Sequence, residues 1–456
     1  MEHTRIIISD LHIGQNDEFD IFAGPNKADL FAGFLTYARR QESPVELVIN
    51  GDFIDFLQLR PWNDLSKDAA LKKIGKIVSG SSYVFESLGN FLKDSRHRIK
   101  ILPGNHDVEL AYPEVGNVLS DAILSTATNG KDRLELFNDH TTYNPIVNGV
   151  LLHIEHGNRG DQWNSLNYTT LFRDAKIGTK KFKYPPGTKL VYETMNRFKE
   201  KLRFVDLLKP EMPAVPLLLM ALKPMMSLLS IPRASVIGLN SIVNGIMGSL
   251  RQSIAGAPLG EINTAAKKYT SVTDQVADYY AAIKPEDFPA PEDVRWFLNA
   301  KEPATESDAQ VLGPVFDHVR LKFLAWALHN LNRFKAAQEG EAFYQRDHPL
   351  TPDSIGAKSC IEGKVKVVVF GHTHEALKTE FSDGLYVNSG TWANLVRMPR
   401  NDKDAMLAWL QTIANNSFEK TAYPTYVKVE PSGQGVSVSL NLWTDNGEHR
   451  LWQKNI

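Results

Sequence analysis

The sequence predicts an α/β layered fold, and two features of its pattern lead to that expectation. Short runs of β-branched and apolar residues, which are typical of buried strands, alternate along the chain with longer stretches of helical periodicity. Five of these apolar runs end in a polar tip with acidic, histidine or asparagine side chains. Strands separated by helices favour layered α/β folds, in which sites gather outside the carboxyl ends of the strands.

The individual elements follow from these patterns in chain order. The run TRIIIS at 4–9 predicts the first buried strand, and the stretches 27–41 and 67–94 have helical patterns. Further strands are expected at 45–52, 98–107, 149–158, 364–374, 384–393, 425–430 and 436–444.

A long segment of different character separates the fourth of these strands from the fifth. It has several helical patterns, of which the clearest is 314–336. We therefore expect a first core part at 1–158, a mostly helical insertion or cap at 159–363, and a second core part at 364–456.

Composition excludes several classes of protein. Of the 456 residues, 43% are hydrophobic and 23% are charged, as in ordinary globular proteins. The net charge of −2 gives no global attraction to nucleic acid, so no nucleic-acid partner is expected. The single cysteine, Cys360, rules out an intramolecular disulfide and a thiolate metal cluster. The first residues lack the pattern of a secretory signal, and a cytoplasmic location is expected.

Five strand tips carry side chains that suit metal binding. In chain order they are Asp10-Leu11-His12, Gly51-Asp52-Phe53-Ile54-Asp55, Gly104-Asn105-His106-Asp107, His156-Gly157-Asn158 and Gly371-His372-Thr373-His374. Taken singly, each could be a helix cap or an ordinary core or surface histidine. Taken together, five ordered blocks that hold five of the thirteen histidines are hard to explain in that way.

These blocks, D-x-H, G-D-x-x-D, G-N-H-[DE], H and G-H-x-H, resemble the signature of the calcineurin-like metallophosphoesterase superfamily. The resemblance covers roughly 1–158 and 364–395 and does not extend to the insertion. It implies a four-layer α/β/β/α sandwich and hydrolysis of a phosphoester or pyrophosphate bond. The opening ISDLHIG is similar to the bacterial branch that includes UDP-diacylglucosamine pyrophosphohydrolases, whereas GDFIDFL and GNHDVEL depart from the pattern of the protein Ser/Thr phosphatases.

The resemblance also implies two divalent metal ions, which together would clamp the attacking and leaving oxygens. The ligands of the first ion would be Asp10, His12 and His374. Those of the second would be Asn105, His156 and His372, with Asp52 as the bridge. His106 would protonate the leaving oxygen, and Asp55 and Asp107 would orient the ligands or His106. Nitrogen and oxygen ligands together suit Mn, Fe, Zn, Ni or Co, of which we favour Mn.

Several neighbouring residues have more than one interpretation. His156 directly precedes a glycine at its strand tip, so we favour it as the ligand over His153, which lies inside the strand. Asp161 and Asn164 could face the substrate or could be turn residues. The segment VNSGTWA at 387–393 is interpreted by default as an edge strand and turn.

Glycines accompany three of the blocks. Gly51, Gly104 and Gly371 are expected to let the backbone turn tightly at each strand end.

The composition of the insertion is relevant to which substrate the protein binds. Residues 212–250 are apolar and contain five of the nine methionines. Core helices of the cap explain this pattern, and so would an acyl-binding cap, a peripheral membrane contact or a homo-oligomer interface. Prolines at 213, 216, 224 and 232 oppose a transmembrane span.

The expected substrate is a phosphorylated small molecule or a lipid, and two other function classes are less consistent with the sequence. A nuclease would need a basic groove, which the net charge does not support. A non-enzymatic scaffold that keeps the fold would be expected to have lost ligands, and this chain has all of them.

Overall fold

The computed structural model describes residues 2–24, 26–161, 164–177, 184–199, 203, 205–207, 352–362, 364–396, 403–414 and 417–456. The chain divides into one unit made of 1–196, 342–394 and 421–456 and a second made of 197–341 and 395–420. The stretches 212–250 and 314–336 lie outside the described residues, so the expectations for them stay predictions. The same holds for the expected domain boundaries.

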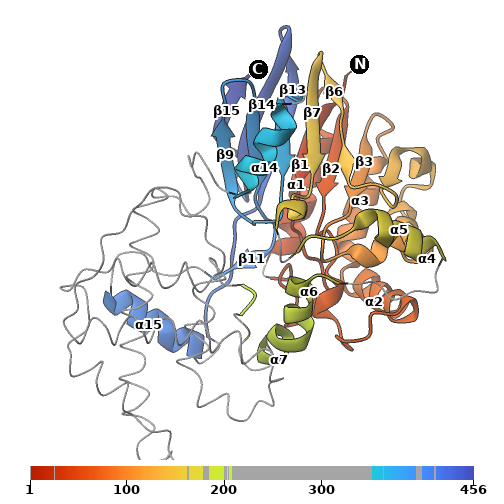
Figure 1. The fold of residues 1–456 in the computed structure, drawn as a ribbon, viewed down its shortest axis with the longest axis vertical. Coiled ribbons are helices and arrows are strands. Elements are labelled where there is room, and N and C mark those ends of the chain that lie inside the picture. Colours follow the sequence, from red (N-terminus) through yellow and green to blue (C-terminus); the bar gives the residue numbers. More distant parts are fainter. Residues whose placement is uncertain are drawn as a thin grey trace, which may run out of the picture. The chain divides into compact units, whose positions relative to one another are not determined.

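The first unit contains a seven-stranded sheet in the order β15-β14-β13-β1-β2-β3-β4 (Figure 1). Strands β1 to β4 run parallel to one another, and β13, β14 and β15 are added antiparallel beside β1. The strands are β1 (Thr4–Ile8), β2 (Val45–Asn50), β3 (Arg98–Leu102), β4 (Leu134–Leu136), β13 (Thr425–Ser432), β14 (Gly435–Thr444) and β15 (Gly447–Asn455).

A second sheet of six strands follows the order β5-β7-β8-β10-β9, with β6 paired to β7. Its centre, β7-β8-β10, is parallel. The strands are β5 (Thr142–Tyr143), β6 (Ile146–Val147), β7 (Val150–Glu155), β8 (Val367–Phe370), β9 (Ala376–Glu380) and β10 (Leu385–Ser389). A separate two-stranded sheet pairs β11 (Asn394–Leu395) with β12 (Thr421–Ala422).

The helices lie between these strands in sequence. The α-helices are α1 (Lys27–Arg39), α2 (Lys67–Gly80), α3 (Ser82–Leu92), α4 (Pro113–Leu124), α5 (Tyr168–Ile177), α6 (Pro186–Leu190), α7 (Asn196–Lys199), α14 (Pro352–Ile361) and α15 (Lys403–Ala414). Short 3-10 helices are η1 (Phe56–Gln58), η2 (Val108–Ala111), η3 (Thr128–Arg133) and η4 (Asn158–Gly160), and η5 (Val191–Met195) is a π-helix.

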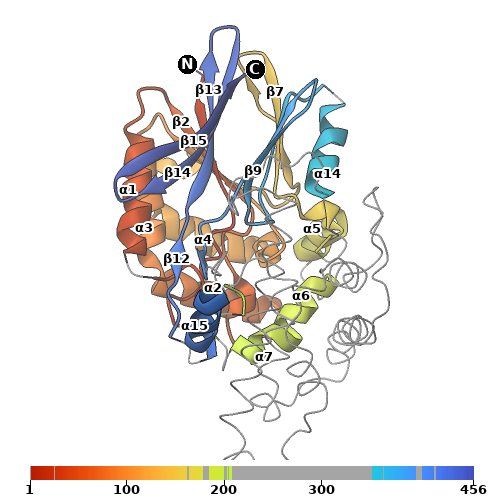
Figure 2. The ribbon, with the colours of Figure 1, turned by 90° about the vertical axis from the view of Figure 1, so that its left-hand side faces the viewer.

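Alternating side chains of the buried strands build the layers. In β1, Ile6 and Ile8 pack with α1 to α4 on the outer face of the first sheet, while Ile7 points into the core between the two sheets. In β8, Val367 and Val369 face that same inner core, and Val368 packs against α14 on the outer face of the second sheet. Figure 2 shows α1 and α3 on one side of the sheets and α14 on the other.

The expected four-layer α/β/β/α sandwich is therefore confirmed for the first unit. Each predicted strand and the first predicted helix are present. The predicted helical stretch 67–94 differs, because it is two helices that meet at Ser81. At that break the Ser81 hydroxyl donates to the Gly14 carbonyl oxygen at 3.0 Å. The loop after β1 thus meets the chain where the helix ends.

Candidate metal centre

All five polar tips lie at the carboxyl ends of parallel strands. Three follow β1, β2 and β3 of the first sheet, and two follow β7 and β8 of the second. Backbone hydrogen bonds join neighbouring tips, from Asp10 N to Gly51 O at 3.2 Å and from Gly371 N to His156 O at 2.9 Å. The stacking of two sheets in one sandwich brings tips from both ends of the chain into one place.

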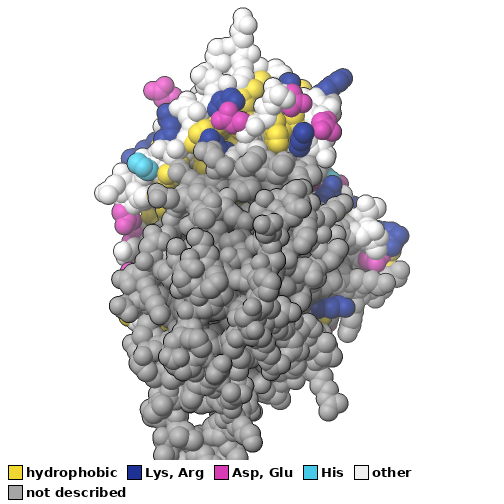
Figure 3. All heavy atoms as spheres, turned by 60° about the vertical axis from the view of Figure 1, so that its left-hand side comes forward, with side chains coloured by type: hydrophobic (Ala, Val, Ile, Leu, Met, Phe, Trp, Pro, Cys, Tyr) yellow, Lys and Arg dark blue, Asp and Glu magenta, His cyan; other side chains and the backbone are white. Residues whose placement is uncertain are grey.

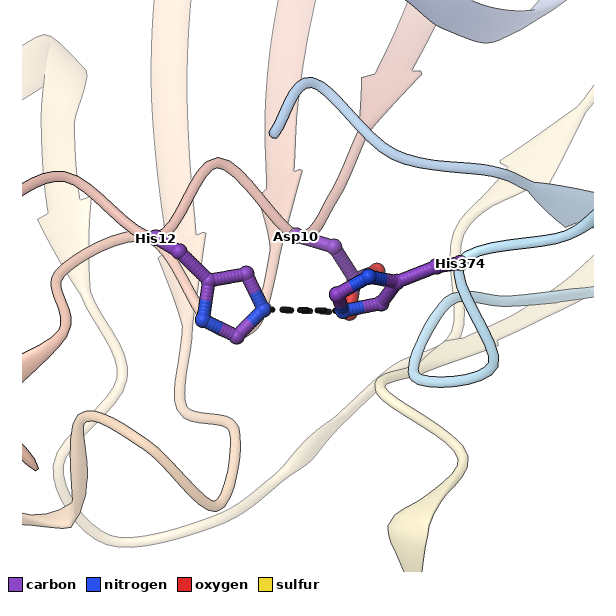
Figure 4. Close-up of side chains that lie close together, drawn as sticks. All are labelled: Asp10, His12 and His374. Atoms are coloured by element: carbon purple, nitrogen blue, oxygen red, sulfur yellow. Dashed lines mark hydrogen bonds and ion pairs between the residues drawn. The ribbon is translucent and has the colours of Figure 1, made fainter. Parts of the chain in front are cut away.

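One group of side chains comes from the ends of β1 and β8. The Nε2 atoms of His12 and His374 are 2.9 Å apart, and His374 Nε2 is 3.3 Å from Asp10 Oδ1 (Figure 4). His12 Nε2 lies 3.9 Å from the same carboxylate oxygen. The three residues are buried, so their polar atoms face one another and not bulk water.

A second group consists of Asp52, His156 and His372. His156 Nε2 is 3.1 Å from Asp52 Oδ2, and that same oxygen is 3.6 Å from His12 Nε2 in the first group. Asp52 therefore lies between the two groups. Asn105 directly precedes His106 in the third tip, and His106 N donates to Asp52 Oδ1 at 2.9 Å. The tip that carries Asn105 is therefore in contact with Asp52.

The spacing of these atoms suits shared cations. Two donor atoms that each lie about 2.1 Å from one ion are about 3.0 Å apart at a right angle and about 4.2 Å apart on opposite sides. The distances within the first group, 2.9, 3.3 and 3.9 Å, fall in or next to this range. The two imidazole Nε2 atoms also face each other, which is an arrangement that a common ion explains.

Charge and hydrogen bonding give the same result. The buried carboxylates Asp10, Asp52, Asp55 and Asp107 have no ion pair with a lysine or arginine among the described residues. The Asn105 Oδ1 atom is buried and accepts no hydrogen bond within the described part of the chain. Buried anions and a buried carbonyl oxygen are costly without a cation or a donor. The residues present therefore fit divalent metal ions.

The protonation states agree with cation binding. Burial alone would raise the pKa of Asp10, but His156 and His374 beside it lower that pKa to about 2. Burial is likewise outweighed at Asp52, whose pKa His156 and His106 hold well below its usual value. Burial would lower the pKa of His156, but Asp52 and Asp10 raise it to about 9. A cation can take the place of the proton that these carboxylates hold on the imidazole.

Asp55 connects His12 with His106. Its Oδ2 atom accepts from His12 Nδ1 and His106 Nδ1, both at 3.1 Å, and from Gln58 Nε2 at 2.9 Å. Burial would lower the pKa of His106, yet Asp55 and Asp52 raise it to about 10. One carboxylate thus orients both imidazole rings and favours a protonated His106.

The Asp107 carboxylate is hydrogen-bonded to backbone groups. Its Oδ1 accepts from Gly104 N at 2.6 Å and its Oδ2 from Phe53 N at 2.8 Å. Burial and the nearby Asp52 raise its pKa to about 7. Asp107 therefore joins the backbones of two strand tips, and in the described hydrogen bonds it does not touch the His106 ring.

The backbone at the site is unusual. Five of the side-chain-bearing residues at the tips have positive φ angles, between 48° and 71°. They are Asp10, His12, Asp52, His372 and His374. Non-glycine residues rarely adopt this left-handed region, and such residues gather at functional sites.

The three block glycines are needed for different reasons. Gly51 has a φ of 81°, as the expected tight turn requires. Gly104 and Gly371 are not in the left-handed region, so a positive φ is not what requires glycine at these two positions. A Cβ at Gly104 would lie 2.1 Å from Asp52 Oδ1, and one at Gly371 would lie 2.6 Å from Asp10 Oδ2. Both keep space for a carboxylate.

Contacts of His153, His156 and Asp161 bear on their alternative interpretations. His156 joins the second group, whereas His153 Nδ1 is hydrogen-bonded to Asn144 Oδ1 at 2.8 Å. Asp161 does form a turn with Asn164, whose Nδ2 donates to it at 2.6 Å, but its Oδ2 also lies 3.0 Å from His372 Nε2. Sequence reasoning missed this contact.

The default interpretation of 387–393 as an edge strand and turn is wrong. Strand β10 lies between β8 and β9, inside the second sheet. Thr391 Oγ1 and Trp392 N both donate to the Asp10 carbonyl oxygen, at 2.8 and 3.1 Å. The segment holds the first tip in place. The Thr391-Trp392 pair after a strand carries no local signal for this contact.

Comparison with known proteins agrees with this geometry. Residues 3–198 match the family model for the calcineurin-like phosphoesterases, which supports the superfamily resemblance. This class consists of metal-dependent phosphoric ester hydrolases, and the protein is an enzyme of that kind. A search of curated proteins gave no match. Within the described ranges, every helix is too short or too polar to cross a membrane.

Proposed function

We propose that this enzyme uses two divalent metal ions, with Mn favoured, to hydrolyse a phosphoester or pyrophosphate bond. The observation that carries the proposal is the position of Asp52 between the two groups, 3.1 Å from His156 Nε2 and 3.6 Å from His12 Nε2. A carboxylate that faces both groups supports a bridged pair of ions, as two-metal phosphoesterases use.

The proposed ligands form two sets, one for each ion. The first ion would be held by Asp10, His12 and His374, and the second by Asn105, His156 and His372, with Asp52 shared. When bound, the ions supply Lewis-acid activation of the phosphoryl group and of the attacking water. The protein supplies their placement, since the tips are fixed by backbone hydrogen bonds and buried packing.

His106 would deliver a proton to the leaving oxygen. Its Nδ1 is hydrogen-bonded to Asp55, so its Nε2 is the atom that can donate. The pKa of His106, about 10, keeps the ring protonated at neutral pH. Its side chain is about one-fifth exposed, which leaves it reachable by substrate. General acids of this kind contribute on the order of 10²- to 10⁴-fold to the rate.

The substrate proposed is lipid-linked or a nucleotide. The similarity of ISDLHIG to the UDP-diacylglucosamine pyrophosphohydrolase branch supports a pyrophosphate or phosphoester with an apolar portion. The methionine-rich stretch 212–250 supports an acyl-binding cap or a peripheral membrane contact. A nuclease gains no support, since Lys and Arg are interspersed with Asp and Glu on the described part of the face in Figure 3.

Metal content and hydrolysis test the two-metal proposal. The purified full-length chain, reconstituted with Mn²⁺, should hold two ions per chain and hydrolyse bis-p-nitrophenyl phosphate or p-nitrophenyl phosphate. Asp52→Asn should lose hydrolysis and at least one ion. The exposed His140→Ala is the matched control and should keep both. Full activity with a single ion per chain would sink the binuclear proposal.

A substrate panel and a vesicle assay test the finer proposal. Hydrolysis is compared among nucleotides, cyclic nucleotides, sugar nucleotides and phospholipids, each with added Mn²⁺. The full-length protein should float with phosphatidylglycerol vesicles, and Leu228→Asp with Leu229→Asp should weaken flotation. Absence of vesicle binding by the unmodified protein, together with preference for a substrate without acyl chains, would contradict the lipid proposal.

A further inference from the structure

His372 is held by a carboxylate from a distant part of the chain. Its Nε2 lies 3.0 Å from Asp161 Oδ2, although the two residues are 211 positions apart in sequence. Asp161 follows β7 and η4, at the carboxyl end of the strand beside β8. Both residues belong to the first unit.

The Asp161 carboxylate is fixed in place by its own turn. The backbone carbonyl oxygen of Asp161 accepts from Asn164 N at 3.1 Å and from Ser165 N at 2.7 Å. Asn164 Nδ2 donates to the same Oδ2 atom that faces His372, at 2.6 Å. Two hydrogen bonds thus hold the Asp161 backbone and a third holds its carboxylate, so this carboxylate can keep an imidazole ring in one orientation.

His372 forms its side-chain hydrogen bond through the other ring nitrogen than two histidines at the centre do. His12 and His156 use Nδ1 for Asp55 Oδ2 and for the Asn50 carbonyl oxygen, and so direct Nε2 toward Asp52. At His372 it is Nε2 that is taken up by Asp161. Its backbone N donates to Asp10 Oδ2 at 3.0 Å, which fixes the other end of the residue. The atom left for ligation is therefore Nδ1.

We propose that Asp161 is a positioning residue whose carboxylate accepts a hydrogen bond from Nε2–H of His372 and so keeps the Nδ1 lone pair available to the second metal ion. Neutral imidazole carries its proton on only one nitrogen, and a carboxylate on one side decides which nitrogen can bind a metal. This inference rests on the proposed metal centre.

Metal titration of variants is the first test. Co²⁺ is titrated into the metal-free full-length protein and its visible absorption bands are followed. Asp161→Ala should weaken one of the two binding steps by about 10- to 100-fold and alter the bands of that step only. Asp161→Asn keeps an acceptor oxygen and should restore much of the lost affinity. Asp139→Ala, which removes an exposed carboxylate beside His140, should change nothing.

A second control separates positioning from turn formation. Asn164→Ala removes a hydrogen bond of the turn and keeps the Asp161 carboxylate. If it weakens binding as much as Asp161→Ala does, Asp161 acts only through the turn and the proposal is overturned. Unchanged Co²⁺ affinity in Asp161→Ala would overturn it as well.

A measurement without metal keeps this inference distinct from the proposed function. Histidine ¹⁵N NMR of the metal-free full-length chain should show His372 protonated at Nε2, with that tautomer lost in Asp161→Ala. A chain that binds no metal but has this tautomer contradicts the proposed centre and retains the Asp161–His372 contact. A wild-type His372 protonated at Nδ1 overturns the positioning role, whatever the metal content.

Discussion

Replacing Gly104 with alanine is the sharpest steric test of the centre. The new Cβ would lie 2.1 Å from Asp52 Oδ1 and 2.4 Å from Asp52 N, closer than real Cβ atoms come. Because Gly104 is not in the left-handed region, the substitution is disfavoured by steric overlap and not by backbone strain. Its neighbours are a backbone nitrogen and a buried carboxylate, so neither can swing aside freely. Asp52 must move by about 1 Å to restore ordinary contact.

The displacement sets the expected magnitude. A misplacement of about 1 Å can cost about 10²-fold in rate, which corresponds to about 2.7 kcal/mol in activation free energy. The shared carboxylate would also fit its ions less well, so Gly104→Ala should retain fewer than two ions per chain. The assay combines hydrolysis of bis-p-nitrophenyl phosphate with elemental analysis of the same sample.

The same substitution elsewhere provides the control. Gly75 lies within α2 and its added Cβ would meet nothing within 4 Å. Gly75→Ala should leave hydrolysis unchanged and raise the free energy of unfolding by about 0.5–1 kcal/mol, because alanine favours the helix. A Gly104→Ala protein with full metal content and full activity would refute the steric reasoning and the position of Asp52.

Three further predictions follow from the site. His374→Ala should abolish hydrolysis and lower metal content, because it removes a ring 3.3 Å from Asp10 Oδ1; wild-type values of both would contradict its role as a ligand. His106→Ala should lower kcat by about 10²- to 10⁴-fold while elemental analysis still finds the metal, whereas loss of metal would mean that His106 is a ligand. Because the pKa of His156 is raised to about 9, metal must displace a proton at lower pH, so apparent affinity should rise as pH increases toward 9 and then level off. Calorimetric titration in two buffers measures the released proton, and a pH-independent affinity would contradict the assignment.

The strands and their tips were the most predictable part of this protein. A run such as TRIIIS predicts a buried strand because it contains consecutive β-branched apolar residues. The tip that follows it can be recognised by its acidic and histidine residues. The strands β9 and β15 and the helix α4 were not predicted. The division of 67–94 into two helices also escaped prediction, since it depends on the loop that meets Ser81.

The sequence by itself determined which chemistry the chain can perform, because each block of carboxylate, imidazole and amide groups can be identified from its own local sequence. The tertiary structure alone decided how those groups meet. The contact of Asp161 with His372, the support of Asp10 by Thr391 and the space kept by Gly104 all join residues far apart in the chain. The physical reason is that these contacts arise only when two sheets stack with their strand ends at one edge, and no local pattern encodes which tips then face each other.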